Sequence, residues 1–220
     1  MQHAASPAIT PLSLQPRTLA IAFGLPVALA LFLSAFGPAD LTTWFLEVAP
    51  VVIAAPLLAF SWKRYPLTTL LYALIALHCL VLILGGAYTY AQVPLGFWLQ
   101  DLLGLERNPY DRIGHLMQGL VPTMIAREIL VRGRHVQGRG MLAFVCVCIA
   151  LAISAAYELV EWGAALILGQ GADEFLGTQG DPWDTQSDMF CALLGSIAAL
   201  GLLSRTHDRQ IAALEAARPA

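Results

Sequence analysis

Long runs of apolar residues alternate with short polar segments along most of the chain. Six of these runs approach the ~20 residues that a membrane-spanning helix needs. They cover residues 18–36, 44–60, 67–88, 111–131, 141–166 and 188–204. The turn signals Gly37-Pro38 and Tyr65-Pro66 separate the first three runs. This pattern predicts an all-α bundle of about six transmembrane helices, which form a single transmembrane domain over residues 18–204.

Composition supports a membrane protein. Of the 220 residues, 58% are hydrophobic and only 12% are charged, whereas a soluble domain carries about 25% charged residues. A soluble core of this size cannot bury so much apolar surface, so the lipid bilayer is the expected partner. The net charge of −3 provides no basic face, which argues against nucleic acid as a partner. The first run follows Arg17 and is longer than the ~7–15 apolar residues of a signal peptide, so we expect a retained helix.

The distribution of basic residues predicts the orientation of the spans. The segments 37–43, 89–110 and 167–187 contain only one basic residue, Arg107, and several acids. Two other arginines lie inside the fourth span, and the alternating segments carry the remaining positive charges: Arg17, Lys63, Arg64, Arg132, Arg134, Arg139, Arg205, Arg209 and Arg218. We therefore expect cytoplasmic tails at residues 1–17 and 205–220, and acid-rich loops that face the periplasm, or the outside in a cell with a single membrane.

Seven ionisable side chains lie at the predicted outer ends of the last three spans. The fifth span starts near Met141, and at 1.5 Å per residue ~20 residues bring it to the outer boundary near Glu161. The other two spans begin at that boundary, so three segments place polar groups at one depth. The seven residues are Asp111, Arg112, His115, Glu158, Glu161, Asp184 and Asp188.

The spacing of these residues places neighbours on shared helix faces. Asp111 and His115 are four residues apart, as are Asp184 and Asp188 if the last helix begins by Asp184. Acids at helix N-termini are favoured by the helix dipole, but Glu158 and Glu161 lie near a C-terminus, where the dipole opposes them. These two glutamates need a cation, a proton or a strong hydrogen-bond donor.

Five carboxylates beside one arginine and one histidine cannot all stay ionised without compensation. In the first interpretation, one divalent metal ion such as Mg, Mn, Zn or Fe is the cofactor. In the second, some acids hold protons and act as general acids or as a proton relay. In the third, salt bridges and helix caps simply hold the loop 169–187. The candidate metal ligands are Asp111, His115, Glu158, Glu161, Asp184 and Asp188.

An enzyme would use these residues in distinct roles. Arg112 would bind a phosphate or a carboxylate of the substrate. The segment 166–186 is rich in glycine and acids and contains Phe175 and Leu176, so it forms either a lid or an interfacial packing loop. The predicted catalytic residues are His115, Glu158, Glu161 and Asp188, and the predicted substrate-binding residues are Arg112, Gln118, Tyr90 and Trp183.

Other polar residues inside the spans are less informative. His78 lies in the middle of the third span, either packed and hydrogen-bonded or at the floor of a cavity that opens outward. Glu47 faces either that cavity or water. Arg127 and Glu128 lie near the inner end of the fourth span and are expected to extend toward the interface. Below His78 the spans read as almost uniformly apolar, which argues against a transport path.

Three stretches closely resemble the YjdF-like family of bacterial inner-membrane proteins. The resemblance covers most of the chain from the first span onward, and its third stretch is long and specific. It implies a multi-pass inner-membrane protein but no particular reaction. The stretches are GAYTYAQVPLG (86–96), NPYDRIGHLMQG (108–119) and YELVEWGAALILGQGADEFLGTQGDPWDTQSDM (157–189).

A fainter similarity is to the VanZ-like family, which is linked to low-level glycopeptide resistance. That family has Asp-Lys-x-x-His, then an acid on a later helix, then an Asp with a Gly seven residues on. The matching residues are Asp111, His115, Glu158 or Glu161, and Asp188 with Gly195. Arg112 replaces the lysine, and Ala192 stands where that family often has Asn. These departures weaken any transfer of a resistance role.

Three classes of function fit the sequence. The first is an enzyme that acts on a lipid or cell-envelope precursor at the outer leaflet. The second is a proton-coupled transporter, which would need polar residues that continue to the cytoplasmic side. The third is a structural or binding membrane protein in which the polar cluster only holds the last three spans together. Because of the outward-facing polar cluster, a site-bearing protein of unknown reaction ranks first, with the enzyme slightly ahead of the transporter.

Overall fold

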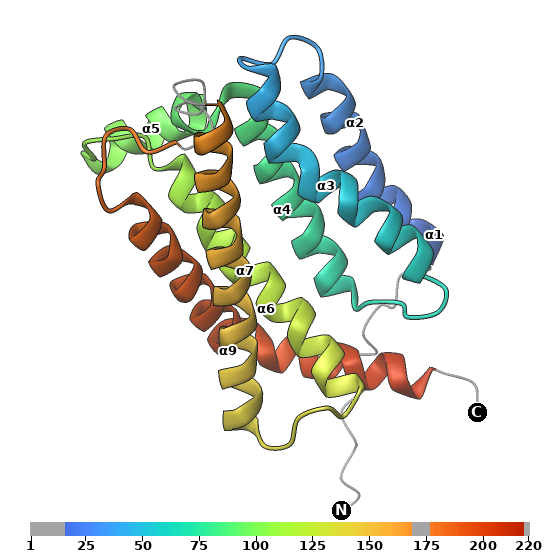
Figure 1. Cartoon of the computed structure of the whole chain (residues 1–220). Coiled ribbons are helices and arrows are strands. Elements are labelled where there is room, and N and C mark those ends of the chain that lie inside the picture. Colours follow the sequence, from blue (N-terminus) through green and yellow to red (C-terminus); the bar gives the residue numbers. More distant parts are fainter. Residues whose placement is uncertain (1–15, 169–176, 218–220) are drawn as a thin grey trace, which may run out of the picture.

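The computed structural model describes residues 16–168 and 177–217, and these residues contain helices and no strands (Figure 1). This all-helical fold is the class that the apolar pattern predicts. The elements are α1 (Pro16–Leu19), the π-helical turn η1 (Ala20–Gly24), α2 (Leu25–Ser34), α3 (Leu41–Ser61), α4 (Thr69–Tyr88), the 3-10 turn η2 (Tyr90–Gln92), α5 (Pro94–Leu103), α6 (Tyr110–Arg132), α7 (Arg139–Leu168) and α9 (Asp184–Ala216).

Four of the described helices, α3, α4, α7 and α9, are long and apolar enough to cross a membrane. The first predicted span consists of the consecutive elements α1, η1 and α2. Helix α6 has 23 residues, about 35 Å of helix, but its charged residues lower its hydropathy. Helix α5 was not predicted and lies within the segment 89–110, between α4 and α6.

Helix α6 is the centre of the bundle. It packs against α9, α7 and α4, and the ribbon of Figure 1 shows it passing between them. Because three helices surround α6, most of its polar side chains are buried against protein. This position explains how the most polar predicted span can lie inside an apolar bundle.

Two glycines allow α6 and α9 to approach closely. A Cβ atom on Gly119 of α6 would overlap the carbonyl oxygen of Ala192 in α9. In the same way, a Cβ on Gly195 of α9 would overlap the carbonyl oxygen of Leu116 in α6. Small residues at such a crossing let two membrane helices pack backbone against backbone.

Gly195→Ala should therefore destabilise the bundle by about 1–3 kcal/mol, because the added methyl group must push α6 and α9 apart. Gly201→Ala on the same helix is the matched control, since a Cβ there meets no atom within 4 Å. Thermal unfolding in detergent, followed by circular dichroism, measures both variants. Equal melting temperatures for the two would show that the close crossing does not stabilise the fold.

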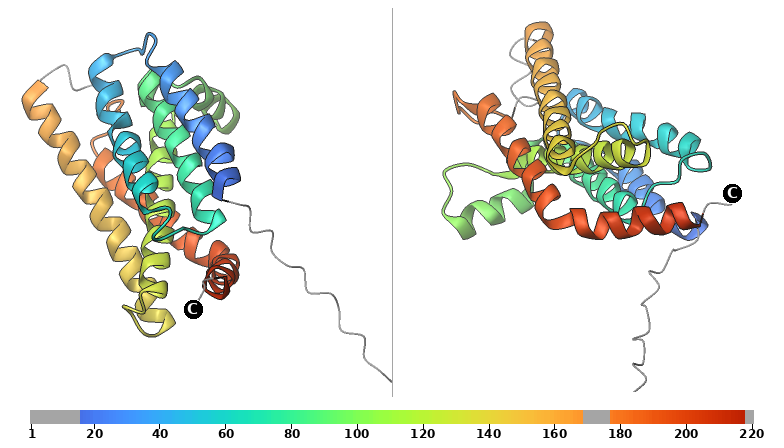
Figure 2. Two further views of the ribbon diagram at one scale, coloured as in Figure 1. Left: turned by 90° about the vertical axis from the view of Figure 1, so that its right-hand side faces the viewer. Right: turned by 90° about the horizontal axis from the view of Figure 1, so that it is seen from below.

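Helix α9 extends beyond the predicted end of the last span at residue 204. It bends, and its last part runs across the lower end of the bundle, the end at which α1 begins (Figures 1 and 2). There His207 and Ile211 are buried, and the side chain of Gln210 accepts a hydrogen bond of 2.9 Å from the backbone N–H of Leu70. The predicted tail 205–220 is thus a packed helix up to Ala216.

A largely buried group that we call the inner polar cluster occupies this end of α6, with Asp208 exposed at its edge. It contains Thr68, Arg127, Glu128, Arg132, His207 and Asp208. The Glu128 carboxylate accepts hydrogen bonds from Thr68 Oγ1 at 2.8 Å, from Arg132 at 2.6 Å and from His207 Nε2 at 2.9 Å. Arg127 donates to His207 Nδ1 at 3.1 Å and to Asp208 at 2.6 Å. Since an arginine can only donate, Nδ1 of His207 accepts and its Nε2 carries the proton.

Two sequence predictions are wrong at this point. Arg127 and Glu128 do not extend to the interface, because only 6% and 0% of their surfaces are exposed. The spans are also not uniformly apolar below His78, since this cluster is buried there. The start of α4 and the end of α9 supply the partners that make burial of these charges possible.

Candidate functional site

The outer half of α6 presents three polar side chains on one face. Asp111, His115 and Gln118 have exposed fractions of 6%, 4% and 9%. His115 Nε2 lies 3.6 Å from Asp111 Oδ1, and His115 Nδ1 lies 3.0 Å from Gln118 Oε1. Helix α6 begins just before these residues, where the side chain of Asn108 accepts a hydrogen bond from the backbone N–H of Tyr110.

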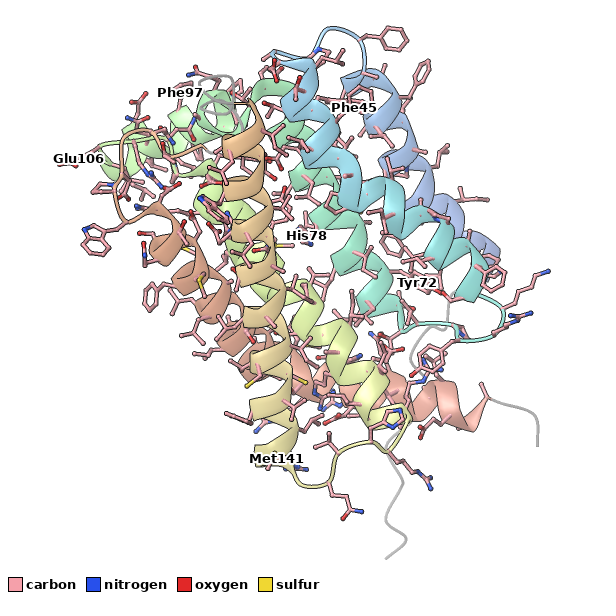
Figure 3. All side chains as sticks on the ribbon, viewed as in Figure 1. Phe45, Tyr72, His78, Phe97, Glu106 and Met141 are labelled. Atoms are coloured by element: carbon pink, nitrogen blue, oxygen red, sulfur yellow. The ribbon has the colours of Figure 1, made fainter. Side chains whose placement is uncertain are left out.

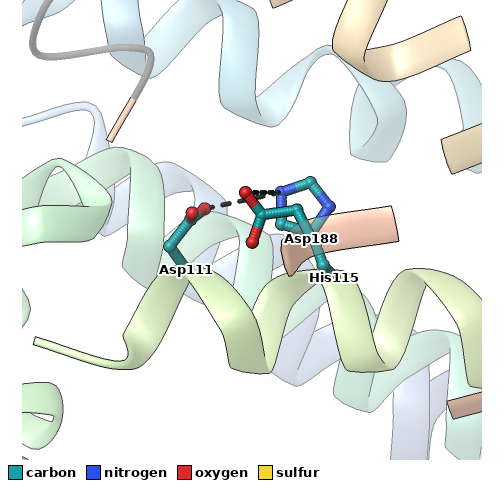
Figure 4. A group of neighbouring side chains, drawn as sticks. All are labelled: Asp111, His115 and Asp188. Carbon is teal, nitrogen blue, oxygen red and sulfur yellow. Dashed lines mark ion pairs between the residues drawn. The ribbon is translucent and has the colours of Figure 1, made fainter. Parts of the chain in front are cut away.

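Helices α7 and α9 bring acids to the same imidazole. Glu158 Oε1 of α7 lies 3.7 Å from His115 Nδ1, and Asp188 Oδ2 of α9 lies 4.0 Å from His115 Nε2. Figure 4 shows Asp188 and Asp111 facing one side of the ring. Two sets of side chains could share a metal ion, because their candidate ligand atoms lie within 4.8 Å of one another. The sets are Asp111, His115 and Asp188, and His115, Glu158 and Glu161.

The hydrogen bond to Gln118 fixes the tautomer of His115. Gln118 Oε1 can only accept, so His115 Nδ1 carries the proton in this arrangement. In a neutral ring, the lone pair of Nε2 then points toward Asp111 and Asp188. One lone pair and two carboxylates repel one another unless a cation or a proton lies between them.

The two nearby arginines, Arg107 and Arg112, form ion pairs with acids other than Asp111 and Asp188. Arg107 binds Asp184 at 2.6 Å, and Arg112 binds Asp181 at 3.1 Å. Although partial burial disfavours the charged guanidinium, the hydrogen bond and charge of Asp184 raise the pKa of Arg107. Within residues 16–168 and 177–217, no lysine or arginine forms an ion pair with Asp111 or Asp188.

The structure therefore separates the predicted site residues into two groups. Asp184 is the first residue of α9 and its charge is neutralised by Arg107. The Arg112 side chain is 39% exposed beside Asp181, and Trp183 is 66% exposed. The other residues surround a cavity or His115: Tyr90, Asp111, His115, Gln118, Glu158, Glu161 and Asp188.

The predicted lid is only partly described. Phe175 and Leu176 lie outside the described residues. The following residues are tied to the segment before α6, because Arg107 donates to the carbonyl of Thr178 at 2.6 Å and Gln179 donates to the carbonyl of Asn108 at 2.9 Å. These bonds hold the chain just before α9 against the chain just before α6.

A cavity of about 190 Å³ lies beside the His115 cluster, with walls from α3, α4, α6 and α7. His78 lines it, and its Nε2 is buried without a hydrogen-bond partner among the described residues. Figure 3 shows His78 in the interior of the bundle. Of the two sequence interpretations, the one that places His78 at a cavity therefore agrees with the structure. The lining is mixed: Glu47, Pro50, His78, Leu82, Tyr90, Asp111, Gly114, His115, Gln118, Pro122, Ile153, Tyr157 and Glu161.

Sequence reasoning gave no role to two polar residues that line the cavity, Glu47 and Tyr157. Glu47 faces the cavity with 3% of its surface exposed, and Tyr157 donates a hydrogen bond of 3.1 Å to its carboxylate. Tyr157 precedes Glu161 by four residues, so the helical period already placed it on the cavity side of α7. Glu47 carried no such signal, because the face that α3 turns to its neighbours depends on the fold.

Tyr90 is held by two helices. Its ring lies where a Cβ atom on Gly85 of α4 or on Gly114 of α6 would be. The side chain is 5% exposed and reaches the cavity from η2, the short turn that follows α4. The two glycines thus position a phenol beside the acids.

The helices and the buried polar site define a multi-pass membrane protein. The chain belongs to the family described as "Predicted membrane protein (DUF2238)", whose pattern matches residues 19–209. The "Inner membrane protein YjdF" of Escherichia coli (strain K12) is 59% identical over 187 residues, which are 85% of this chain and 90% of that protein. No solved structure matches the chain. The predicted family, class and inner-membrane location are therefore confirmed.

Proposed function

We propose that the cavity beside His115 is a divalent-cation centre that acts on a lipid or cell-envelope precursor at the outer side of the membrane. One observation carries the proposal: Nε2 of His115 faces two buried carboxylates, those of Asp111 and Asp188. One imidazole with several carboxylates suits Mn, Zn, Fe or Mg. Asp184 leaves the predicted ligand set because Arg107 neutralises it.

Unpaired oxygens support a ligand at this position. Asp111 Oδ2, Glu158 Oε1 and Asp188 Oδ1 are buried and make no hydrogen bond within the described residues. A buried polar atom without a partner costs about 1–3 kcal/mol, and more when it is charged. A cation held by Asp111, His115 and Asp188 would compensate the two aspartates, whereas Glu158 belongs to the second candidate set, with His115 and Glu161.

The side chains around the cavity would then have separate roles. A bound cation polarises a phosphoryl or carbonyl oxygen and a water molecule. Glu161 lines the cavity and makes no ion pair among the described residues, so it would accept a proton from that water. Gln118 would hold His115 in the tautomer that binds the cation. Tyr90 would donate a hydrogen bond to the substrate.

The orientation is part of the proposal. We place six spans in the membrane, with both tails in the cytoplasm and the acid-rich loops outside. Two observations support this: the arginine distribution of the sequence, and the position of the start of α1 and the end of α9 at one end of the bundle (Figure 2). The His115 cluster lies toward the other end.

Elemental analysis of the purified protein tests the cation centre. The wild type should carry about one transition-metal or magnesium ion per chain, the one-to-one ratio of a single ligand set. His115→Ala and Asp188→Asn should lose it, because each removes a ligand. The exposed residues His135 and Asp101 provide matched controls, His135→Ala and Asp101→Asn, which should keep the metal. A metal-free wild type, or equal metal in all variants, would overturn the proposal.

A proton-coupled transporter is the second candidate, favoured by polar groups that continue along the interface of α6 and α9. Between the His115 cluster and the inner polar cluster, Thr123 and Ser196 share a buried hydrogen bond of 2.6 Å. Glu128, however, is 0% exposed and hydrogen-bonded through both oxygens, which closes this path. Proteoliposomes with a pH-sensitive dye inside would separate the candidates, since only a transporter acidifies the lumen under a proton gradient.

A further inference from the structure

On one side, the cavity beside His115 lies between two helices, α3 and α7, that do not pack against each other. Helix α3 packs against α4, and α7 packs against α6 and α9, but α3 and α7 have almost no contact. The hydrogen bond from Tyr157 of α7 to Glu47 of α3 spans this side. It is the one described side-chain bond that joins these two helices.

The outer end of the cluster is covered by the chain before α9. A Cβ atom on Gly177 would lie 3.5 Å from Asp111 Cγ, so the backbone at Gly177 packs directly on this carboxylate. The bond from Arg107 to the carbonyl of Thr178 and the ion pair of Arg107 with Asp184 hold that segment in place. A substrate arriving from the water above Asp111 would meet this segment first.

The side between α3 and α7 reaches hydrocarbon depth. Ile153 lines the cavity, and 41% of its surface is exposed. It lies eight residues before Glu161, which is about 12 Å along the helix. With Glu161 near the outer boundary, Ile153 falls within the outer half of a hydrocarbon core ~30 Å thick. The cavity therefore adjoins acyl chains at Ile153.

We infer that the cavity receives a membrane lipid sideways from the outer leaflet, between α3 and α7. The head group would lie at the His115 cluster, and one chain would lie against Pro50, Leu82 and Ile153. The inference rests on the proposed function, because a phosphate-bearing head group would be repelled by the carboxylates unless a cation is bound. It narrows the substrate from any envelope precursor to one anchored in the bilayer. The hydrogen bond between Tyr157 and Glu47 would close this opening, and we call it the latch.

Lipid retention tests the route. The protein would be reconstituted in nanodiscs of phosphatidylethanolamine and phosphatidylglycerol, released into mild detergent and weighed by native mass spectrometry. The wild type should retain one lipid per chain. Ile153→Trp, which fills the opening, should retain at least tenfold less. Leu159→Trp is the matched control on the same helix, since Leu159 is 64% exposed and does not line the cavity, and it should retain the lipid.

A second variant opens the latch without adding bulk. Tyr157→Phe removes the hydrogen bond to Glu47, so a retained lipid should exchange with deuterated lipid several-fold faster than in the wild type. Equal retention in the wild type and Ile153→Trp, together with an unchanged exchange rate in Tyr157→Phe, would overturn the lateral route.

The metal content of the same samples separates this inference from the proposed function. Metal in a wild type that retains no lipid would overturn the lipid route and leave the cation centre standing. A lipid that is retained by the wild type without metal, and lost in Ile153→Trp, would overturn the cation centre and the head-group position that depends on it, and leave only the lateral route standing. Metal and lipid together, with only the lipid lost in Ile153→Trp, is the expected result.

Discussion

Glu128→Ala should lower the free energy of unfolding by about 3–5 kcal/mol, because it leaves buried charge without its partner. Glu128 is 0% exposed and accepts hydrogen bonds from Thr68, Arg132 and His207. Without the carboxylate, the guanidinium of Arg132 would lose its ion pair and His207 would lose the acceptor of its Nε2 proton. Arg132 would keep its hydrogen bond to the carbonyl of Pro66 and its contact with the ring of Tyr65, but Nε2 of the fully buried His207 would lose its acceptor.

Chemical unfolding in mixed micelles measures this effect. Glu215→Ala is the matched control, because Glu215 is exposed near the end of α9, and exposed substitutions of this kind stay within about 0.5 kcal/mol. His207→Ala should also destabilise the protein, and the double variant should lose less than the sum of the two, since both remove one hydrogen-bond network. A Glu128→Ala protein as stable as the control would show that the inner polar cluster contributes nothing to the fold.

Removal of metal should produce the second large effect, at the other end of α6. A cation that binds only the folded state stabilises it by about 4 kcal/mol when the free ion is present at a thousand times its Kd. EDTA should therefore lower the melting temperature of the wild type by several degrees. Mn²⁺ or Zn²⁺ added after removal of EDTA should restore it.

Asp188→Asn provides the sharper form of this test, because its effect should change sign. In EDTA the variant should be more stable than the wild type, since it removes one of the carboxylates that face His115 Nε2 without a partner. In the presence of metal it should be less stable, since it removes a ligand. Asp101→Asn should be neutral in both conditions. An effect of Asp188→Asn that has the same sign with and without metal would contradict a cation centre.

The sequence predicts which side chains lie at the same level, because that depends only on their distance along each helix. The rise per residue is fixed, so the positions of Asp111, Glu161 and Asp188 relative to the ends of their spans predict acids at one level. The structure places Asp111 and Asp188 around His115 as this argument expects. The helical period likewise places Gln118 on the face of His115, and the two side chains are hydrogen-bonded.

The sequence does not predict which side chains on different helices contact each other, because that depends on how each helix is rotated and on which helices lie beside it. Glu128 and His207 are 79 residues apart and meet only because α9 bends across the end of α6. We predicted that charged side chains near the end of a span extend to the membrane interface. That prediction fails when a segment distant in sequence supplies a buried partner for the charge. Arg107 and Asp184 form a pair of the same kind, which removes from the site an acid that spacing alone assigned to it.

The contact of Tyr90 with Gly85 and Gly114 has a consequence for how this family can diverge. The ring occupies the space of two absent side chains, so neither glycine can become larger while the tyrosine remains. A relative that replaces Tyr90 with a small residue frees that volume on both helices. The three positions should therefore change together among homologues, and a pair of larger residues at 85 and 114 should mark proteins whose cavity has lost its phenol.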